Sequence, residues 1–337
     1  MVGLDNVKDS YIVWWLDFGG LPPHRASLRE VWIWIKCQFS DGGVMKVLAL
    51  VMRAAVISLI ISLLARAAET PNITFKFSTI HLKGEMATQV VGVNNAGVMV
   101  GTWVDSGGVI HGLMLKSGKA TTIEDPKGVV TYCKGVNLSG DIVGYYQDSS
   151  GVIHGFLRRG GKFSDVGPAG ATSSVAFGIN DKGNIAGFFV DAKNVAHGFV
   201  RKGKQYQQLD VPGARLTEAV GINNAGLVTV QTENEHANHI DGAIYDGRTY
   251  TMIDVPGSIS SYPQGIDSAG DVVFSWTDAA GNFHGALRVV GGTFYKFDDP
   301  KGTRGTDAEG INDHRLVVGL FLTSRNGLAE GFKAVYK

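Results

Sequence analysis

A repeat of about 43 residues constrains this chain of 337 residues more than any other feature of its sequence. A Gly-(Ile/Val)-(Asn/Asp) triplet begins six times, at Gly92, Gly135, Gly178, Gly221, Gly265 and Gly310. The successive intervals are 43, 43, 43, 44 and 45 residues. A fixed period of this length is typical of repeat proteins, in which each unit buries its apolar face against its neighbours.

Each triplet leads into a tight turn. In five units the turn has Asn or Asp at its first position and Gly at its fourth, the signature of a type I turn. We interpret these glycines as structural, and they are Gly97, Gly140, Gly183, Gly226 and Gly270. The sixth unit differs, because Arg315 stands where the Gly is expected.

Each unit contains four short segments rich in β-branched and aromatic residues, divided by Gly, Pro, Asn and Asp. These are strand signals, and nothing follows a helical period. Six units of four strands predict an all-β chain, a six-bladed β-propeller over residues 74–337. The chain ends before the fourth strand of the last unit, and residues 76–80 match residues 119–123 in kind. We therefore expect residues 76–80 to pair beside residues 332–336, so that the N-terminal strand closes the last blade and removes free sheet edges.

Two motifs recur together in the units. One pair is Gly178-Ile-Asn-Asp-Lys-Gly183 with Ala196-His-Gly-Phe199, and another is Gly135-Val-Asn-Leu-Ser-Gly140 with Ile153-His-Gly-Phe156. On these motifs, residues 75–337 resemble the HAF-type family of bacterial extracellular repeats. The resemblance implies export and a propeller-like fold, and it brings no catalytic residues. Units four and six depart from the pattern, since they read Asp241-Gly-Ala and Glu330-Gly-Phe.

The segment before the repeats has the composition of a targeting signal. Residues 54–64 are almost wholly apolar, follow Arg53 and precede Ala65-Arg66-Ala67. We interpret residues 45–67 as a signal peptide cleaved near Ala67 or Ala68, with an uncleaved membrane anchor as the alternative. After cleavage the domain would have no membrane span and would be secreted, periplasmic or on the cell surface.

Residues 1–44 share nothing with the repeats and hold four of the six tryptophans. Because a signal peptide has no reason to begin 44 residues late, we interpret them as a non-native or disordered extension, with translation starting at Met45 or Met52. A membrane-surface segment that uses interfacial tryptophans is the alternative.

Charge and cysteine content exclude two classes of site. The 31 basic and 31 acidic residues cancel, so no basic surface for nucleic acid is expected. Cys37 and Cys133 are the only cysteines, and the expected cleavage separates them. The sequence therefore offers neither a disulfide framework nor a cysteine zinc site.

Four histidines lie 19 residues after the first Gly of their unit: His111, His154, His197 and His284. We interpret them as structural, each hydrogen-bonding a neighbouring loop; a metal-binding ring of histidines is the alternative.

The loops between second and third strands and the connections between blades should share one face of the propeller. Because these segments contain many aspartates, that face should be acidic. Its ligand candidates are Asp105, Asp148, Asp191 and Asp278. The opposite face should carry basic turns, so the two faces would form a dipole that orients a charged partner. Aspartates that only cap their own turns are the alternative.

The fourth unit is irregular, reading Glu233-Asn-Glu-His-Ala-Asn-His-Ile-Asp241 where other units have Asp-x-x-Gly. Glu235, His236 and His239 supply donors that zinc accepts, so they are candidates for a divalent metal site. A solvated loop without metal is the alternative.

No Gly-x-Ser-x-Gly, His-Glu-x-x-His or phosphate-binding loop occurs in the sequence. The sequence thus favours an exported, monomeric binding or scaffolding module that meets an extracellular protein or polysaccharide at the acidic face and channel mouth. A metal-dependent hydrolase or lyase is the alternative, and enzyme activity stays open. An enzyme should gather unique polar residues near one channel mouth, whereas a scaffold should keep six-fold equivalence.

Overall fold

The computed structural model describes residues 72–234, 239–323 and 329–337. The chain divides into two units, residues 1–71 and 72–337, and the description below concerns the second. The expected signal peptide and extension lie outside the described residues. Within the described part, no helix has the length and apolarity needed to cross a membrane.

The described residues form an all-β fold of 24 strands without a helix. The strands are β1 (Phe75–Ile80), β2 (Ala87–Val93), β3 (Met99–Val104), β4 (Ile110–Lys116), β5 (Lys119–Ile123), β6 (Val130–Val136), β7 (Ile142–Gln147), β8 (Ile153–Arg159), β9 (Lys162–Val166), β10 (Ser173–Ile179), β11 (Ile185–Val190), β12 (Ala196–Lys202), β13 (Gln205–Leu209), β14 (Ala214–Ile222), β15 (Val228–Asn234), β16 (Ile240–Tyr245), β17 (Tyr250–Met252), β18 (Ser260–Ile266), β19 (Val272–Thr277), β20 (Phe283–Arg288), β21 (Phe294–Phe297), β22 (Gly305–Ile311), β23 (Leu316–Leu322) and β24 (Ala329–Tyr336).

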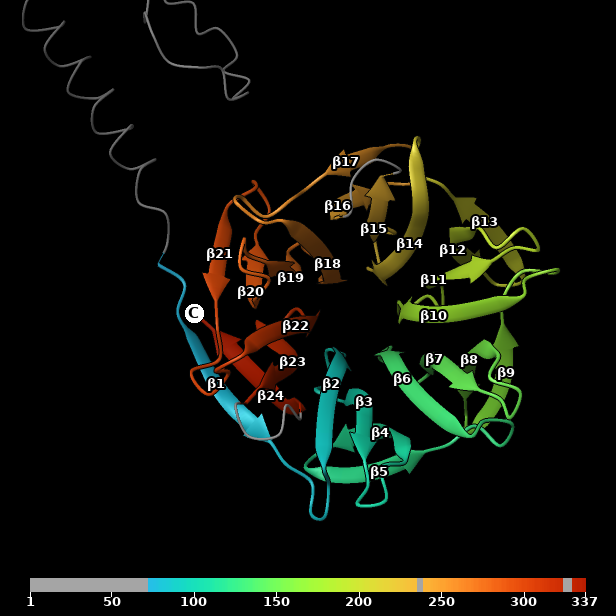
Figure 1. Ribbon diagram of the computed structural model, residues 1–337, viewed down its shortest axis with the longest axis horizontal. Coiled ribbons are helices and arrows are strands. Elements are labelled where there is room, and N and C mark those ends of the chain that lie inside the picture. The colour runs from blue at the N-terminus through green and yellow to red at the C-terminus, as the bar shows by residue number, and fades with distance from the viewer. Residues whose placement is uncertain (1–71, 235–238, 324–328) are drawn as a thin grey trace, which may run out of the picture. The chain divides into compact units, whose positions relative to one another are not determined.

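The strands pair in antiparallel groups of four that follow the sequence repeat. β2–β5 and β6–β9 are separate four-stranded sheets. β10–β17 form one eight-stranded sheet, and β18–β24 with β1 form another. In each of these, two groups of four meet at one parallel residue pair, Ala196–Leu216 or Phe283–Gly305. The groups stand around a central axis, with β2, β6, β10, β14, β18 and β22 innermost (Figure 1).

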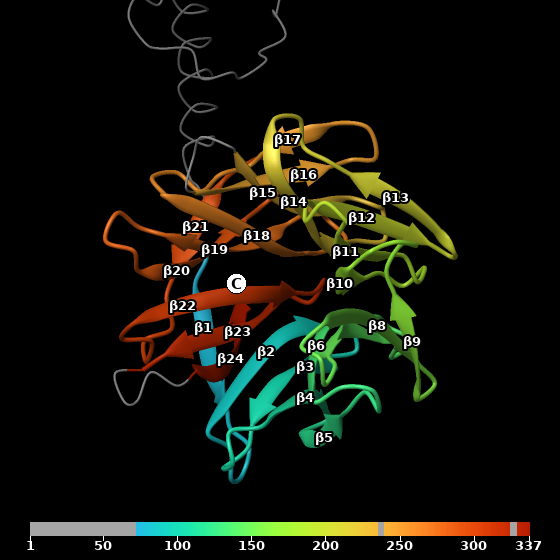
Figure 2. The same ribbon diagram turned by 45° about the vertical axis from the view of Figure 1, so that its right-hand side comes forward.

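The expected pairing of the two chain ends is present. β1 pairs antiparallel with β24, with Lys76 opposite Val335 and Ile80 opposite Gly331. The two strands run side by side in both views (Figures 1 and 2). The ring centres of Phe75 and Phe297 lie 4.1 Å apart. An N-terminal strand therefore supplies the fourth strand of the last group, and its aromatic residues pack against that group.

The triplet glycines let neighbouring inner strands approach closely. A Cβ atom on Gly178 would lie 2.5 Å from the carbonyl oxygen of Val220 in the next inner strand. The same contact joins the sixth unit to the first, since a Cβ atom on Gly310 would lie 2.9 Å from the carbonyl oxygen of Val91. No side chain fits at such a distance from backbone, which explains why Gly recurs at this position.

A ring of asparagines, defined by the last residue of each triplet, joins the units one to the next. Five side-chain amides each donate to a backbone carbonyl of the following unit. The bonds are Asn94 to Asn137 (2.8 Å), Asn137 to Asn180 (3.3 Å), Asn180 to Asn223 (2.9 Å), Asn223 to Asp267 (2.9 Å) and Asn312 to Asn94 (2.9 Å). The last bond joins the sixth unit back to the first. Asp267 holds the sixth position, and a carboxylate there has no N–H to donate.

Each ring side chain also fixes its own turn. The Oδ1 atom of Asn180 accepts the backbone N–H groups of Lys182 and Asn184 at 3.1 and 3.0 Å. The turn glycines assigned from the sequence have φ between +72° and +97°, and Arg315 has φ +59° at the equivalent position. Gly predominates there because L residues adopt this conformation at a cost.

Apolar clusters lie between neighbouring groups. One cluster combines Val143 and Leu157 of the second group with Ile185 and Phe199 of the third. The Phe of the His-Gly-Phe motif is fully buried in both the second and the third group. Packing and the asparagine ring therefore act on the same interfaces.

Replacing one ring amide tests this interaction. Asn180→Ala removes the bond to the Asn223 carbonyl and the Oδ1 atom that accepts two backbone N–H groups in the turn, so we expect a loss of about 1–3 kcal/mol in the free energy of unfolding. Urea unfolding measures it. The control is Asn224→Ala. The Asn224 side chain donates to the Asp181 carboxylate and accepts the Asp181 backbone N–H, both at the exposed surface, so its removal should cost less than about 1 kcal/mol. Equal losses in the two variants would contradict the assigned role.

Candidate functional site

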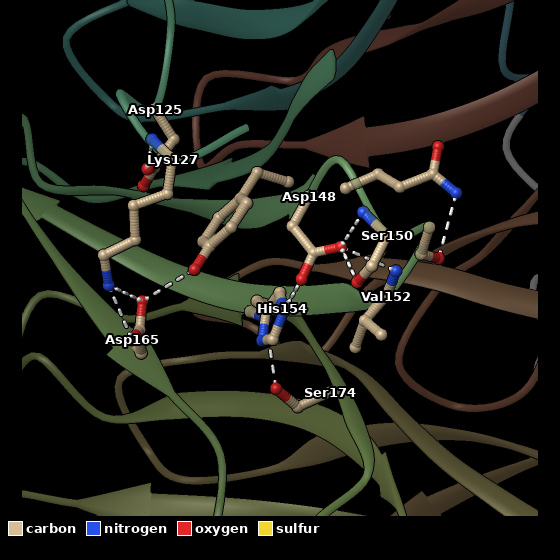
Figure 3. Close-up of polar contacts among 12 residues, drawn as sticks. Asp125, Lys127, Asp148, Ser150, Val152, His154, Asp165 and Ser174 are labelled. Carbon is tan, nitrogen blue, oxygen red and sulfur yellow. Dashed lines mark hydrogen bonds and ion pairs between the residues drawn. The ribbon is translucent and has the colours of Figure 1, made fainter. Parts of the chain in front are cut away.

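Three of the four repeated histidines connect two loops at one face, and the fourth, His154, bonds one loop, because Gly167 stands where the others meet an acidic side chain. His154 bonds Asp148 through Nε2 at 2.8 Å and stacks on Tyr146, with ring centres 5.0 Å apart (Figure 3). His111 bonds Glu124 through Nδ1 at 2.7 Å and lies 3.4 Å from Asp105. His197 and His284 make the equivalent contacts with Asp191 and Asp210, and with Asp278 and Asp298. These contacts place the loops between second and third strands on the same face as the acidic connections between strand groups.

The four candidate aspartates of that face are bonded within their own loops. Asp148 Oδ1 accepts the backbone N–H groups of Ser150 and Val152 at 2.9 and 3.0 Å (Figure 3). Asp105, Asp191 and Asp278 accept equivalent pairs. Bonds within the loops, with a further contribution from the histidines, hold the pKa of all four carboxyls below their usual range. Their oxygens thus stabilise the loops themselves.

The candidate metal site falls partly outside the described residues, which exclude Glu235 and His236. His239 Nε2 lies 3.1 Å from Asp241 Oδ1. Across the part of the chain that the structure describes, no group of three or more His, Cys, Asp or Glu residues is arranged to hold a metal ion. The metal site stays a prediction.

A central cavity of about 220 Å³ lies where the inner strands end. It is lined by the last three residues of these strands, from Val91–Val93 to Glu309–Ile311, together with Gln231. This end adjoins the asparagine ring and the turns with basic side chains, as the 2.8 Å bond from Arg159 Nε to Asp141 shows. The cavity is therefore nearer the basic turns than the acidic face where we expected a ligand.

The side chains around this cavity differ between the six units. The residue before the triplet Gly is different in nearly every unit: Val91, Lys134, Phe177, Val220, Gln264 and Glu309. The Gly that follows is present in all six. Polar residues that differ from unit to unit thus gather around the central cavity, beside a Gly that is present in every unit.

A charged cluster lies among these inner strands. Burial, and then the negative charge of Glu309, raise the pKa of Asp307 well above its usual range, while the Lys134 ammonium opposes that rise. The Ser275 hydroxyl donates to Asp307. Burial raises the pKa of Glu218 to about 7, and Lys134 again acts in the opposite direction. One ammonium group from the second unit therefore balances carboxyl groups from the fourth and sixth.

The Lys134 amine also lies 5.8 Å from the centre of the Phe177 ring. Our interpretation of the sequence did not single out any of these cavity residues. A comparison of the six units at the position before the triplet Gly would have found them, because that position alternates between apolar, cationic, amide and acidic side chains.

No family model matches the sequence, and no curated protein matches it. Solved structures of similar fold include TolB from Acinetobacter baumannii, with 8% identity, TM-score 0.51, and coverage of 74% of this chain and 66% of that one. Another is a six-bladed β-propeller lectin from the fungus Aleuria aurantia, with 12% identity, TM-score 0.46, and coverage of 76% and 93%. A third is the β-propeller domain of the Trilobed protease from Pyrococcus furiosus, with 11% identity, TM-score 0.44, and coverage of 73% and 95%. At these identities the likeness concerns the fold.

The electrostatic role of Lys134 can be tested directly. Because its ammonium stabilises the ionised form of Glu218, we expect Lys134→Met to raise the pKa of Glu218 further above 7. Carboxyl ¹³C chemical shifts followed against pH measure this value. Lys119→Met, which removes an exposed lysine of β5, is the control and should leave the pKa of Glu218 unchanged. An unchanged pKa in Lys134→Met would show that the two groups do not interact.

Proposed function

We propose that this protein is an exported binding module of the HAF type, a six-bladed β-propeller that takes its ligand in the central cavity. Three contacts support a closed ring of six blades: the glycine contact from Gly310 to Val91, the amide bond from Asn312 to Asn94, and the pairing of β1 with β24. Export follows from the signal-like segment at residues 45–67 and from the resemblance to bacterial extracellular repeats, and it places the domain in the periplasm, at the cell surface or outside the cell.

One observation carries the binding proposal. The units keep the Gly and Asn positions that hold the ring together, yet they place different side chains around the common cavity. Lys134, Gln264 and Glu309 differ from one another and from the apolar residues at the same position of the other units, so the cavity wall is asymmetric. An asymmetric wall suits an asymmetric ligand, since a six-fold ring would present the same group six times.

The cavity also indicates the class of ligand. Its volume, about 220 Å³, is below the roughly 300–1,000 Å³ of pockets for drug-sized molecules, so it suits a small molecule or the end of a chain. Lys134 offers donors, Glu309 offers acceptors, and the amide of Gln264 offers both. Adjacent hydroxyl groups of a ligand can form hydrogen bonds with these three side chains. The C–H groups of the same ligand can pack against the Phe177 ring. We therefore favour the terminal unit of an extracellular saccharide.

A second candidate function is hydrolysis of such a ligand. Asp307, a buried carboxyl with raised pKa beside the charge of Glu309, and Glu218, a carboxyl whose pKa is about 7, are the kind of groups that act as general acid and base. The metal-dependent form of this activity would need the loop at Glu235, His236 and His239.

One experiment tests both export and binding. The full chain is expressed in a bacterial host, and the protein recovered outside the cytoplasm is weighed by intact mass spectrometry. We expect a mass that corresponds to a chain beginning at Ala68 or Glu69. The same protein is then titrated calorimetrically with neutral, acidic and amino-sugar oligosaccharides: cello-oligosaccharides, oligogalacturonides and chito-oligosaccharides.

Variants separate the cavity from the outer surface. Lys134→Ala and Gln264→Ala should weaken binding of the recognised oligosaccharide by about tenfold or more, because each removes a hydrogen-bonding group from the cavity. Lys119→Ala on β5 is the control and should bind normally. Binding that the cavity variants leave intact would place the site elsewhere, and failure of all three oligosaccharide classes to bind would reject a saccharide ligand. Release of shorter products would favour the hydrolase.

A further inference from the structure

The asparagine ring has one position that differs in chemistry. Asp267 occupies it, between Asn223 and Asn312. Its backbone carbonyl accepts the Asn223 amide as in the other units. Its Oδ1 atom accepts the backbone N–H groups of Gly270 and Asp271, both at 2.9 Å, which is how the ring asparagines use their Oδ1 atoms.

Because Asp267 uses its Oδ1 atom as the ring asparagines do, its Oδ2 atom corresponds to their side-chain amide nitrogen. In the other five units the atom at this position is an amide nitrogen that donates to the next unit's carbonyl. In the fifth unit that carbonyl belongs to Asn312, so by equivalence we infer that the Oδ2 atom of Asp267 faces the Asn312 carbonyl oxygen across the seam between the fifth and sixth units. Two acceptors can form a hydrogen bond only if a proton lies between them.

The surrounding charges favour that proton. Asp271 faces Asp267 from its own turn and Asp313 faces it from the sixth unit, and both are acidic. Tyr336 of β24 also interacts with this group, and its own pKa is raised to about 12 by burial and by Asp271 and Asp267. The cations in the neighbourhood act on other groups, Arg315 on Tyr336 and Arg288 on Asp271. Asp267 is buried, with 7% of its surface exposed.

We propose that Asp267 is protonated in the folded protein at mildly acidic pH and donates to the Asn312 carbonyl, so that acid completes the asparagine ring and ionisation weakens the seam between the fifth and sixth units. Burial, with the charges of Asp271 and Asp313, raises the pKa of Asp267 to about 6. The seam lies in the wall of the central cavity, because Gly265 and Ile266 line it.

The direction of the pH dependence follows from the pKa. A carboxyl whose pKa is about 6 in the folded chain and near 4 in the unfolded chain stabilises the fold fully below pH 4, and this contribution is lost as the pH rises through 6. Aspartates with lowered pKa, such as Asp148 and Asp278, act in the opposite direction. Subtracting the pH dependence of the free energy of unfolding of a variant at residue 267 from that of wild type isolates the contribution of Asp267.

Urea unfolding of the full chain between pH 4 and pH 8 tests the proposal with two reciprocal variants. Relative to Asp267→Asn, which supplies the missing amide, the unfolding equilibrium constant of wild type should rise by about tenfold or more across this range. Asn180→Asp places the same carboxyl in the equivalent position of the third unit, and we expect it to acquire a similar pH dependence.

A direct titration gives the second measurement. The carboxyl ¹³C signal of Asp267 should titrate with a midpoint near 6 in the folded protein. An Asp267→Asn variant with the same pH dependence as wild type, or an Asp267 signal that titrates near 4, would overturn the proposal. Because Asp267→Asn restores the side chain found in the other five units, it should fold, and the test does not depend on the fate of Asn180→Asp.

Discussion

The side-chain amide that follows five of the six inner strands makes the interaction on which the other features depend. Its oxygen holds the turn of its own unit, and its nitrogen bonds the backbone of the next, as Asn180 does for the third and fourth units. Local turn geometry and the placement of neighbouring units are therefore set by one side chain. The triplet Gly makes this bond reachable, because only a residue without Cβ lets inner strands come so close.

In this ring, the residues that hold the units together are distinct from the side chains that line the cavity. The Gly and Asn positions are fixed by backbone contacts, whereas the residue before each Gly faces a common cavity and needs only to fit. Lys134, Phe177 and Glu309 can therefore differ without disturbing the units that carry them. In the acidic loops, by contrast, carboxylates such as Asp148 already accept hydrogen bonds from the backbone of their own loop and bond to His154.

Much of this fold was predictable because a repeat reports its own strand boundaries six times. The 43-residue period, the turn glycines and the match of residues 76–80 to a missing fourth strand gave the strand groups and the pairing of β1 with β24. The candidate site was less accessible, since Lys134, Glu218 and Asp307 belong to different units and meet only when the inner strands assemble. We predicted the site at the other face because its loops contain many aspartates. In the structure, these aspartates accept hydrogen bonds from the backbone of their own turns.

Closure of the ring through the chain ends is the central claim, and a disulfide across β1 and β24 measures it most directly. Ser78 and Lys333 are exposed and directly opposed in the two strands, and opposed residues in antiparallel strands have the Cα separation that a disulfide needs. In a Cys37→Ser background, Ser78→Cys with Lys333→Cys should form this bond within one chain on oxidation. The bond should also raise the melting temperature, because it closes a loop of nearly the whole domain. Cys133 is buried and free, so the thiols introduced at positions 78 and 333 are the ones followed. If these two thiols stay free, or link only between molecules, the result would contradict a ring closed by the N-terminal strand.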